Sequence, residues 1–184
     1  MAVKKKEYKE TDIVGIVNLM PWDIYFSVTS ATNPNVKTDY MIPGYVAAEK
    51  LRDKTFKKCT FAQIQELIND NANTICGTDG YGSHAAIMIV DPDAYHQLFN
   101  TDDEIPVQLT DENTKKVLEA QSMSELVQLL EEYAPTSYEK RKLMFEIGKI
   151  QEKENNIMNF IVEGVEKAYM IQQYGKEYYN YVRN

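Results

Sequence analysis

The residue types that could do chemistry are densest between positions 77 and 84, where the chain reads Gly-Thr-Asp-Gly-Tyr-Gly-Ser-His. Three of the eight glycines of the chain lie there. A glycine-rich loop binds a phosphate group when it leads from a strand into the N-terminus of a helix. The apolar run that follows, 85–90, is instead typical of a strand, and the segment lacks the lysine of a phosphate-binding loop. The pattern favours a tight hairpin turn at Asp79-Gly80, between strands at 74–77 and 85–90.

The same segment contains the side chains of an acid–base mechanism, with Ser83 as nucleophile, His84 as base and Asp79 as the orienting carboxylate. Such a mechanism requires hydrogen-bond reach between its members. Adjacent residues of an extended chain point to opposite faces, so Ser83 and His84 should diverge. We therefore predict that the chain is not an enzyme and has no catalytic residue. Asp79, Gly80, Gly82 and His84 are predicted to have a structural role in the turn.

Metal ligation is the second possible chemistry. The chain has two cysteines and two histidines, which are Cys59, Cys76, His84 and His96. Zinc sites usually present paired ligands two to four residues apart, and these four residues are separated by longer gaps. Buried free thiols in a reducing compartment account for both cysteines. We predict no metal and no cofactor.

Carboxylates are the third group, in the acidic clusters 102–104, 111–112 and 131–132. Paired carboxylates can bind a divalent cation or share a proton. Asp111 and Glu112 suit the first turn of a helix, where negative charge is favourable. The other two clusters are typical of a solvated surface.

Tyrosines distinguish the C-terminal end, because five of the 13 lie in the last 16 residues. Tyr174, Tyr178 and Tyr181 follow the spacing i, i+4, i+7, which predicts one helical stripe. Such a stripe combines apolar area with hydrogen-bonding tips, and it can pack on its own chain or on a neighbouring subunit. The single tryptophan, Trp22, is a further candidate for protein interaction if exposed; its place between two strands favours burial.

Charge limits the partners. The formal net charge is −8, from 10 basic and 12 acidic residues in 1–100 and 10 basic and 16 acidic residues in 101–184. Nucleic-acid affinity depends on Lys and Arg, so direct binding to nucleic acid is not expected. Residues 1–10 lack the apolar core of a signal peptide, and no apolar run is long enough to span a membrane.

The elements that must position these residues predict an α+β fold, with a small, mostly antiparallel sheet domain followed by a helical domain. Residues 1–12 are predicted to be a flexible basic terminus, 13–100 the α+β domain and 101–184 the helical domain with a tyrosine-rich terminal helix. Strands are expected at 13–17 and 24–29. Capped helices are expected after Thr60, Asp91, Thr110 and Ser122, and a last helix from Asn155.

The order of these features resembles small virion-associated proteins of tailed phages and prophages. The likeness lies in Pro21–Phe26, in the capped helix 60–68, in Gly-Thr-Asp-Gly-x-Gly-x-His-Ala at 77–85, and in Val107–Thr110 before the helical part. Residues 137–184 are longer and more aromatic than the usual ending of that group. The resemblance implies a virion or assembly component without enzymatic activity, and supplies no functional residue.

Two hypotheses of function follow. The first is a phage structural or assembly protein in the virion or the host cytoplasm, which binds other virion proteins or itself as a homo-oligomer. The alternative is a phage-encoded acidic inhibitor of a host defence or nucleic-acid-binding protein, whose carboxylates compete for a basic groove. Binding by an acidic patch should weaken sharply with salt, whereas tyrosine-driven assembly should persist.

Overall fold

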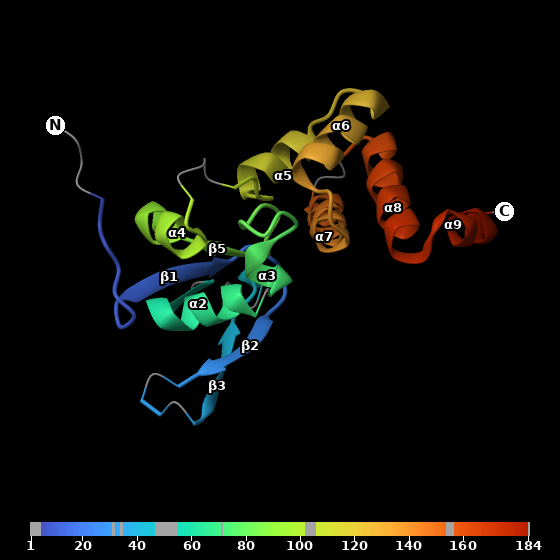
Figure 1. The fold of residues 1–184 in the computed structure, drawn as a ribbon. Helices are drawn as coiled ribbons and strands as arrows, with labels where there is room; N and C mark the ends of the chain where they lie inside the picture. The colour runs from blue at the N-terminus through green and yellow to red at the C-terminus, as the bar shows by residue number, and fades with distance from the viewer. Residues whose placement is uncertain are drawn as a thin grey trace. The chain divides into compact units, whose positions relative to one another are not determined.

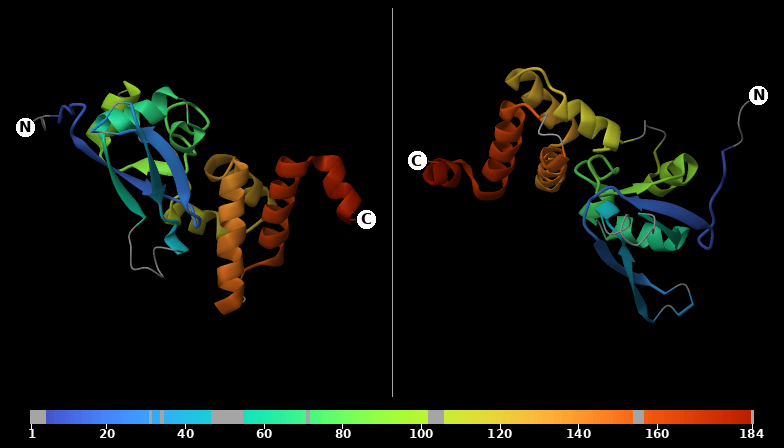
Figure 2. Two further views of the ribbon diagram at one scale, coloured as in Figure 1. Left: turned by 90° about the horizontal axis from the view of Figure 1, so that it is seen from below. Right: turned by 180° about the vertical axis from the view of Figure 1, so that it is seen from behind.

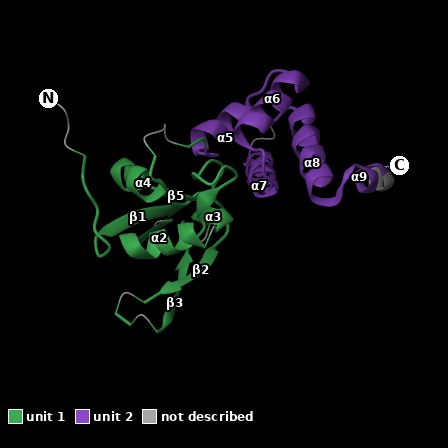
Figure 3. Cartoon of the chain, viewed as in Figure 1, with its two compact units in different colours: residues 1–107 green, residues 108–184 purple. Residues whose placement is uncertain are grey.

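The computed structural model describes residues 5–30, 32–33, 35–46, 55–70, 72–101, 106–153 and 157–183. Residues 181–183 are described through their backbone alone. The chain forms two compact units, residues 1–107 and 108–184 (Figure 3). The secondary structure of the two units confirms the predicted α+β fold, because an antiparallel sheet region is followed by helices (Figure 1). The unit boundary lies after Val107 rather than at residue 100, because the Val107 carbonyl accepts a hydrogen bond from the His84 N–H at 2.7 Å.

Unit 1 contains a three-stranded sheet with β1 at its centre. Its strands are β4 (Phe56–Thr60), β1 (Ile13–Asn18) and β5 (Ile87–Ile89), in that order and all antiparallel. Val14 and Ile16 of β1 are buried on one face, as the alternation of a strand requires. The predicted strand at 13–17 is confirmed, and the predicted strand at 85–90 is shorter than expected.

A separate ribbon pairs β2 (Ile24–Thr29) with β3 (Lys37–Ile42). Asn18 fixes the bend that leads into it, because its side-chain amide donates to the carbonyls of Trp22 at 2.8 Å and Ile42 at 3.1 Å. The amide oxygen of Asn18 accepts from the Met20 N–H at 2.8 Å. This buried side chain is thus satisfied on both its donor and acceptor sides, which holds the ribbon to β1.

Two helices pack on the three-stranded sheet, α2 (Phe61–Asn69) and α4 (Pro92–Phe99). The capping box of α2 is present, with the Gln63 N–H donating to Thr60 and the Gln63 side chain accepting from the Thr60 N–H. Asp91 caps α4 by accepting from the N–H groups of Asp93 and Ala94. These caps satisfy helix-terminal donors, as their sequences predicted.

The N-terminal segment contradicts the prediction of a flexible terminus over residues 5–12. Tyr8 is only 5% exposed, and its ring stacks on Phe61 with centroids 5.9 Å apart. The backbone of Tyr8 makes two hydrogen bonds of 2.7 Å with the Gln97 side chain, and its hydroxyl donates to Asp91 at 2.6 Å. Burial of the Tyr8 ring and these hydrogen bonds fix the segment on α4. Residues 1–4 lie outside the described part of the chain.

The hairpin interpretation of the glycine-rich segment was wrong. Residues 73–76 form a one-turn helix, α3 (Asn73–Cys76), instead of a strand. The strand that pairs with β5 is β1, which lies far away in the sequence. The glycine-rich segment is therefore a loop between α3 and β5 and not a turn between paired strands.

Helices are the only regular secondary structure in the described residues of unit 2. Its helices are α5 (Asp111–Leu118), α6 (Met123–Tyr133), α7 (Ser137–Lys153), α8 (Asn159–Tyr174) and α9 (Lys176–Arg183). The expected caps are found for α5 and α6, whose first turns donate to Thr110 and Ser122. The Glu125 carboxylate accepts from the Gln121 N–H rather than from that of Ser122. The predicted last helix is divided in two at Gly175, and Asn155, its predicted start, lies outside the described residues.

The core of unit 2 lies between α5, α6, α7 and α8. Its buried apolar side chains include Leu109, Val117, Leu126, Leu143, Ile161 and Val165. Lys142 is also buried, and its ammonium group donates to the Leu109 carbonyl at 2.6 Å. Burial lowers the pKa of Lys142 below its ordinary value, against the opposing effect of nearby carboxylates. α9 projects from the end of α8, away from the rest of this unit (Figures 1 and 2).

No helix in the described ranges is both long and apolar enough to cross a membrane.

Candidate protein-interaction surface

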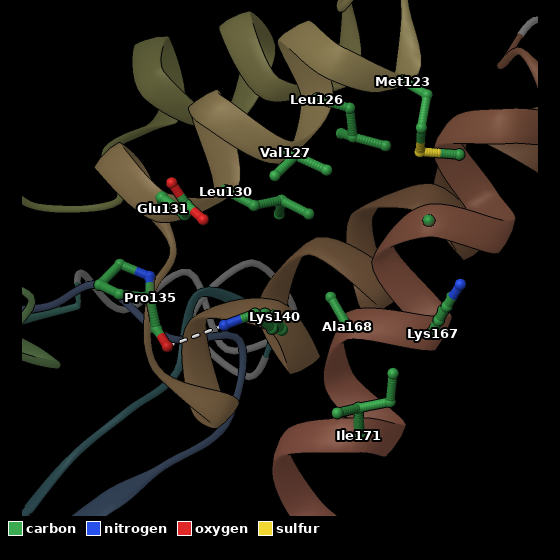
Figure 4. A pocket seen from close by; sticks show the side chains of 11 residues that line it. Met123, Leu126, Val127, Leu130, Glu131, Pro135, Lys140, Lys167, Ala168 and Ile171 are labelled. Atoms are coloured by element: carbon green, nitrogen blue, oxygen red, sulfur yellow. Dashed lines mark hydrogen bonds between the residues drawn. The ribbon is translucent and has the colours of Figure 1, made fainter. Parts of the chain in front are cut away.

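Unit 2 contains an apolar groove between α6 and α8, with a volume of about 540 Å³ (Figure 4). α6 contributes four apolar side chains, and α8 contributes Gly164, Ala168 and Ile171. The α6 residues are Met123, Leu126, Val127 and Leu130. Met123 and Val127 are 48% and 47% exposed, so the wall formed by α6 is open to solvent. We call this feature the α6–α8 groove.

Gly164 sets the depth of the α6–α8 groove at one end. A Cβ atom at this position would lie 2.6 Å from Cδ2 of Leu126 and 3.4 Å from Sδ of Met123. The absence of a side chain therefore allows α8 to approach α6 closely.

Lys140 lies at the opposite end of the groove, and its charge is engaged within unit 2. The ammonium group donates to the Pro135 carbonyl and to the Gln172 side chain, both at 2.7 Å. The Lys140 side chain is largely buried, and this burial lowers its pKa. The groove end is thus a fixed polar boundary, whereas Glu131 and Lys167 are exposed charges along the groove.

Two of the predicted tyrosines extend this apolar surface. Tyr174 follows Ile171 by three residues and so lies on the same side of α8. Tyr174 and Tyr178 are 53% and 48% exposed, and their ring centroids are 5.2 Å apart across the joint at Gly175. The predicted single stripe is therefore a surface shared by two helices. The side chain of Tyr181 lies outside the described residues.

Trp22, the other predicted contact residue, lies in unit 1 at the bend between β1 and β2. The sequence left two alternatives for this side chain, an exposed contact residue or a buried core residue. In the structure the Trp22 side chain is half-buried. Its carbonyl accepts from Asn18, so its backbone belongs to the internal bend. The structure does not bring Trp22 together with the tyrosines in one unit.

The loop 77–84 satisfies much of its polar backbone internally. The Asp79 carboxylate accepts from the N–H groups of Tyr81 at 2.7 Å and Ser83 at 3.1 Å. Partial burial acts to raise the pKa of Asp79, but a hydrogen bond from the Ser83 side chain and the backbone N–H donors together outweigh it and lower the pKa below its ordinary value. Gly80 and Gly82 have φ angles of 82° and 95°, and His84 has 59°, so the loop depends on left-handed backbone. The carboxylate of Asp79 thus holds the backbone of this loop at Tyr81 and Ser83. The structural role predicted for Asp79, Gly80, Gly82 and His84 stays a prediction.

Cys59 and Cys76 are both buried free thiols. Burial raises the pKa of Cys59 to about 11 and raises that of Cys76 as well. Within the described residues, no three His, Cys, Asp or Glu side chains form a group that could hold a metal ion. The acidic cluster 102–104 lies outside the described residues, whereas Glu131 lines the α6–α8 groove.

The sequence interpretation missed the groove itself. It predicted a capped helix after Ser122, and the structure buries Leu126 and Leu130 of that helix. The signal was the additional pair Met123 and Val127, four residues apart, which widens the apolar face beyond what one core contact needs.

No family model, curated protein or solved structure matches this chain.

Proposed function

We propose that this chain acts by binding other proteins through unit 2, as a structural or assembly component of a phage particle. The observation that carries the binding role is the α6–α8 groove with its exposed walls. Exposed apolar surface is costly in water and commonly marks a site of protein interaction. The phage assignment is supported by the sequence resemblance of residues 14–133.

A protein partner suits this surface better than a small molecule does. The groove volume alone falls in the range of small-molecule pockets. The apolar surface, however, continues past Ile171 to Tyr174 and Tyr178 on α8 and α9. An amphipathic helix laid into the groove would cover Val127 and these tyrosines at the same time.

The proposal includes the absence of catalysis. The polar groups of the α6–α8 groove are few, and Lys140 already donates to Pro135 and Gln172. Tyrosines in this role supply large contact area at low conformational entropy cost. Partners are expected to be other virion proteins or further copies of this chain, in the virion or the host cytoplasm.

Particles produced with the parent chain and with the Val127→Glu chain test this function. Antibody detection should find the parent chain in purified particles. The Val127→Glu chain should fold normally, because Val127 is exposed, yet be missing from particles or fail to support their assembly. Tyr25→Glu is the matched control, since Tyr25 is exposed and belongs to unit 1, whereas the groove belongs to unit 2. Absence of the parent chain from particles would contradict the assembly role.

A further inference from the structure

Unit 2 carries both an uncovered groove and a separate terminal helix. α9 begins after Gly175, whose φ of 88° lies in the left-handed region that favours glycine. A Cβ atom at Gly175 would meet nothing within 4 Å, so this side of the joint between α8 and α9 is unpacked. The joint directs α9 away from α5–α7 (Figures 1 and 2). The residues that line the groove include none from α9 of the same copy.

α9 has the composition of a helix that docks by one face. Tyr178 is exposed on the described surface of this helix, and a further tyrosine, Tyr181, follows it three residues later in the sequence. Within its own copy, α9 contacts α8 near the groove, where the Lys167 ammonium lies 5.9 Å from the centroid of the Tyr179 ring. Lys167 itself lines the groove, so the helix starts beside the surface that lacks a cover.

We infer that the α6–α8 groove binds α9 of a second copy of this chain, and that two copies exchange these helices reciprocally. The inference rests on the proposed function, because it names the partner of the same groove. Reciprocal exchange gives an isologous dimer, in which each copy offers the same two surfaces. Both the exposed α6 wall and the exposed tyrosines are then buried in one association step.

Length and charge are consistent with this occupant. At about 1.5 Å per residue, α9 is roughly 12 Å long and fits along α6, which is roughly 16 Å long. The groove carries one exposed carboxylate, Glu131, and one exposed ammonium, Lys167. α9 begins with the opposite pair, Lys176 and Glu177, so a docked helix can present a complementary charge to each.

Light scattering with size exclusion on full-length chains tests the exchange. The parent chain should be a dimer. Val127→Glu, which damages the groove, and Tyr178→Glu, which damages the helix, should each be monomeric and folded. The decisive sample is an equimolar mixture of the two variants, because each retains the half that the other lacks. The mixture should form heterodimers at a concentration at which each variant alone is monomeric.

Controls keep these results interpretable. Tyr25→Glu should leave the dimer intact, since Tyr25 lies in unit 1. If a glutamate variant fails to fold by circular dichroism, Val127→Ser and Tyr178→Ser replace the pair.

Three results would overturn the exchange. A parent chain that stays monomeric at all concentrations would refute self-association, while particle incorporation could still support the proposed function with another partner. A dimer that persists in both variants would place the contact elsewhere. A mixture that remains monomeric would show that helix and groove do not recognise each other.

Discussion

The two terminal segments of the described chain differ in how they use their aromatic residues. Residues 5–12 place Tyr8 against Phe61 and satisfy its backbone through Gln97. α9, at the other end, leaves Tyr178 half exposed beside Tyr174. A terminal segment that buries its ring and pairs its polar groups closes its own unit. One that exposes its rings retains apolar area for association, and this difference distinguishes unit 1 from unit 2.

The largest expected effect is the loss of the Tyr8 ring. Tyr8→Ala removes a buried aromatic side chain and should lower the free energy of unfolding by about 3 kcal/mol. Urea denaturation followed by circular dichroism measures this change. Tyr8→Phe is the matched variant, because it keeps the ring and removes only the hydroxyl bond to Asp91, so it should cost about 1 kcal/mol. An unchanged Tyr8→Ala protein would mean that the N-terminal segment does not close unit 1.

A second prediction concerns the internal loop of unit 1. Gly77 has a φ of 66°, and a Cβ atom there would lie 1.9 Å from the Ser83 carbonyl oxygen. Gly77→Ala should therefore destabilise the protein by about 2 kcal/mol or more. Gly80→Ala has a similar φ but open space around it, so its cost should be about 1 kcal/mol. Equal thermal shifts for the two variants would contradict the close loop packing.

The third prediction uses pH. The Tyr8 hydroxyl, the backbone N–H groups of α4 and the Lys6 charge lower the pKa of Asp91, although partial burial opposes them. A lowered folded-state pKa contributes stability that is present above the unfolded pKa and is lost as pH falls through the folded value. Asp91→Asn should therefore cost about 1 kcal/mol at neutral pH, and the difference should shrink in acid. A difference that stays constant across this acid range would contradict the role of the Asp91 charge.

The smallest effect on stability is expected in unit 2. Val127→Ser and Tyr178→Ser change exposed side chains, so the free energy of unfolding should stay within about 0.5 kcal/mol of the parent value, measured in dilute protein. The same variants should lose association. A large destabilisation of the monomer would instead mean that these side chains pack within their own unit, which would remove the contrast with Tyr8.

Local sequence signals predicted most element types of the fold. The pairs Thr60–Gln63 and Asp91–Pro92 located helix starts because a cap depends on residues within one turn. The β-branched run at 13–17 located β1 for the same local reason.

Elements that depend on distant contacts escaped prediction. α3 has only four residues, too few to display a helical period, and the sequence pattern there predicts a strand instead. β4, Phe56–Thr60, contains two lysines and no β-branched run, and its pairing with β1 defines it as a strand. Tyr8 looked like part of a solvated basic terminus because its partner Asp91 lies 83 residues away. The exposure of Val127 likewise depends on how α8 packs, so the candidate tyrosines were found from sequence and the α6–α8 groove was not.

Amide hydrogen exchange of the full chain, below and well above its association midpoint, tests the central claim that unit 2 carries the binding surface. Association should slow exchange in α6, in α8 around Ala168 and in α9, because covered helices open less often. The β2–β3 ribbon of unit 1 should be unchanged. Protection confined to that ribbon, or no concentration-dependent protection in α6, α8 and α9, would contradict the account.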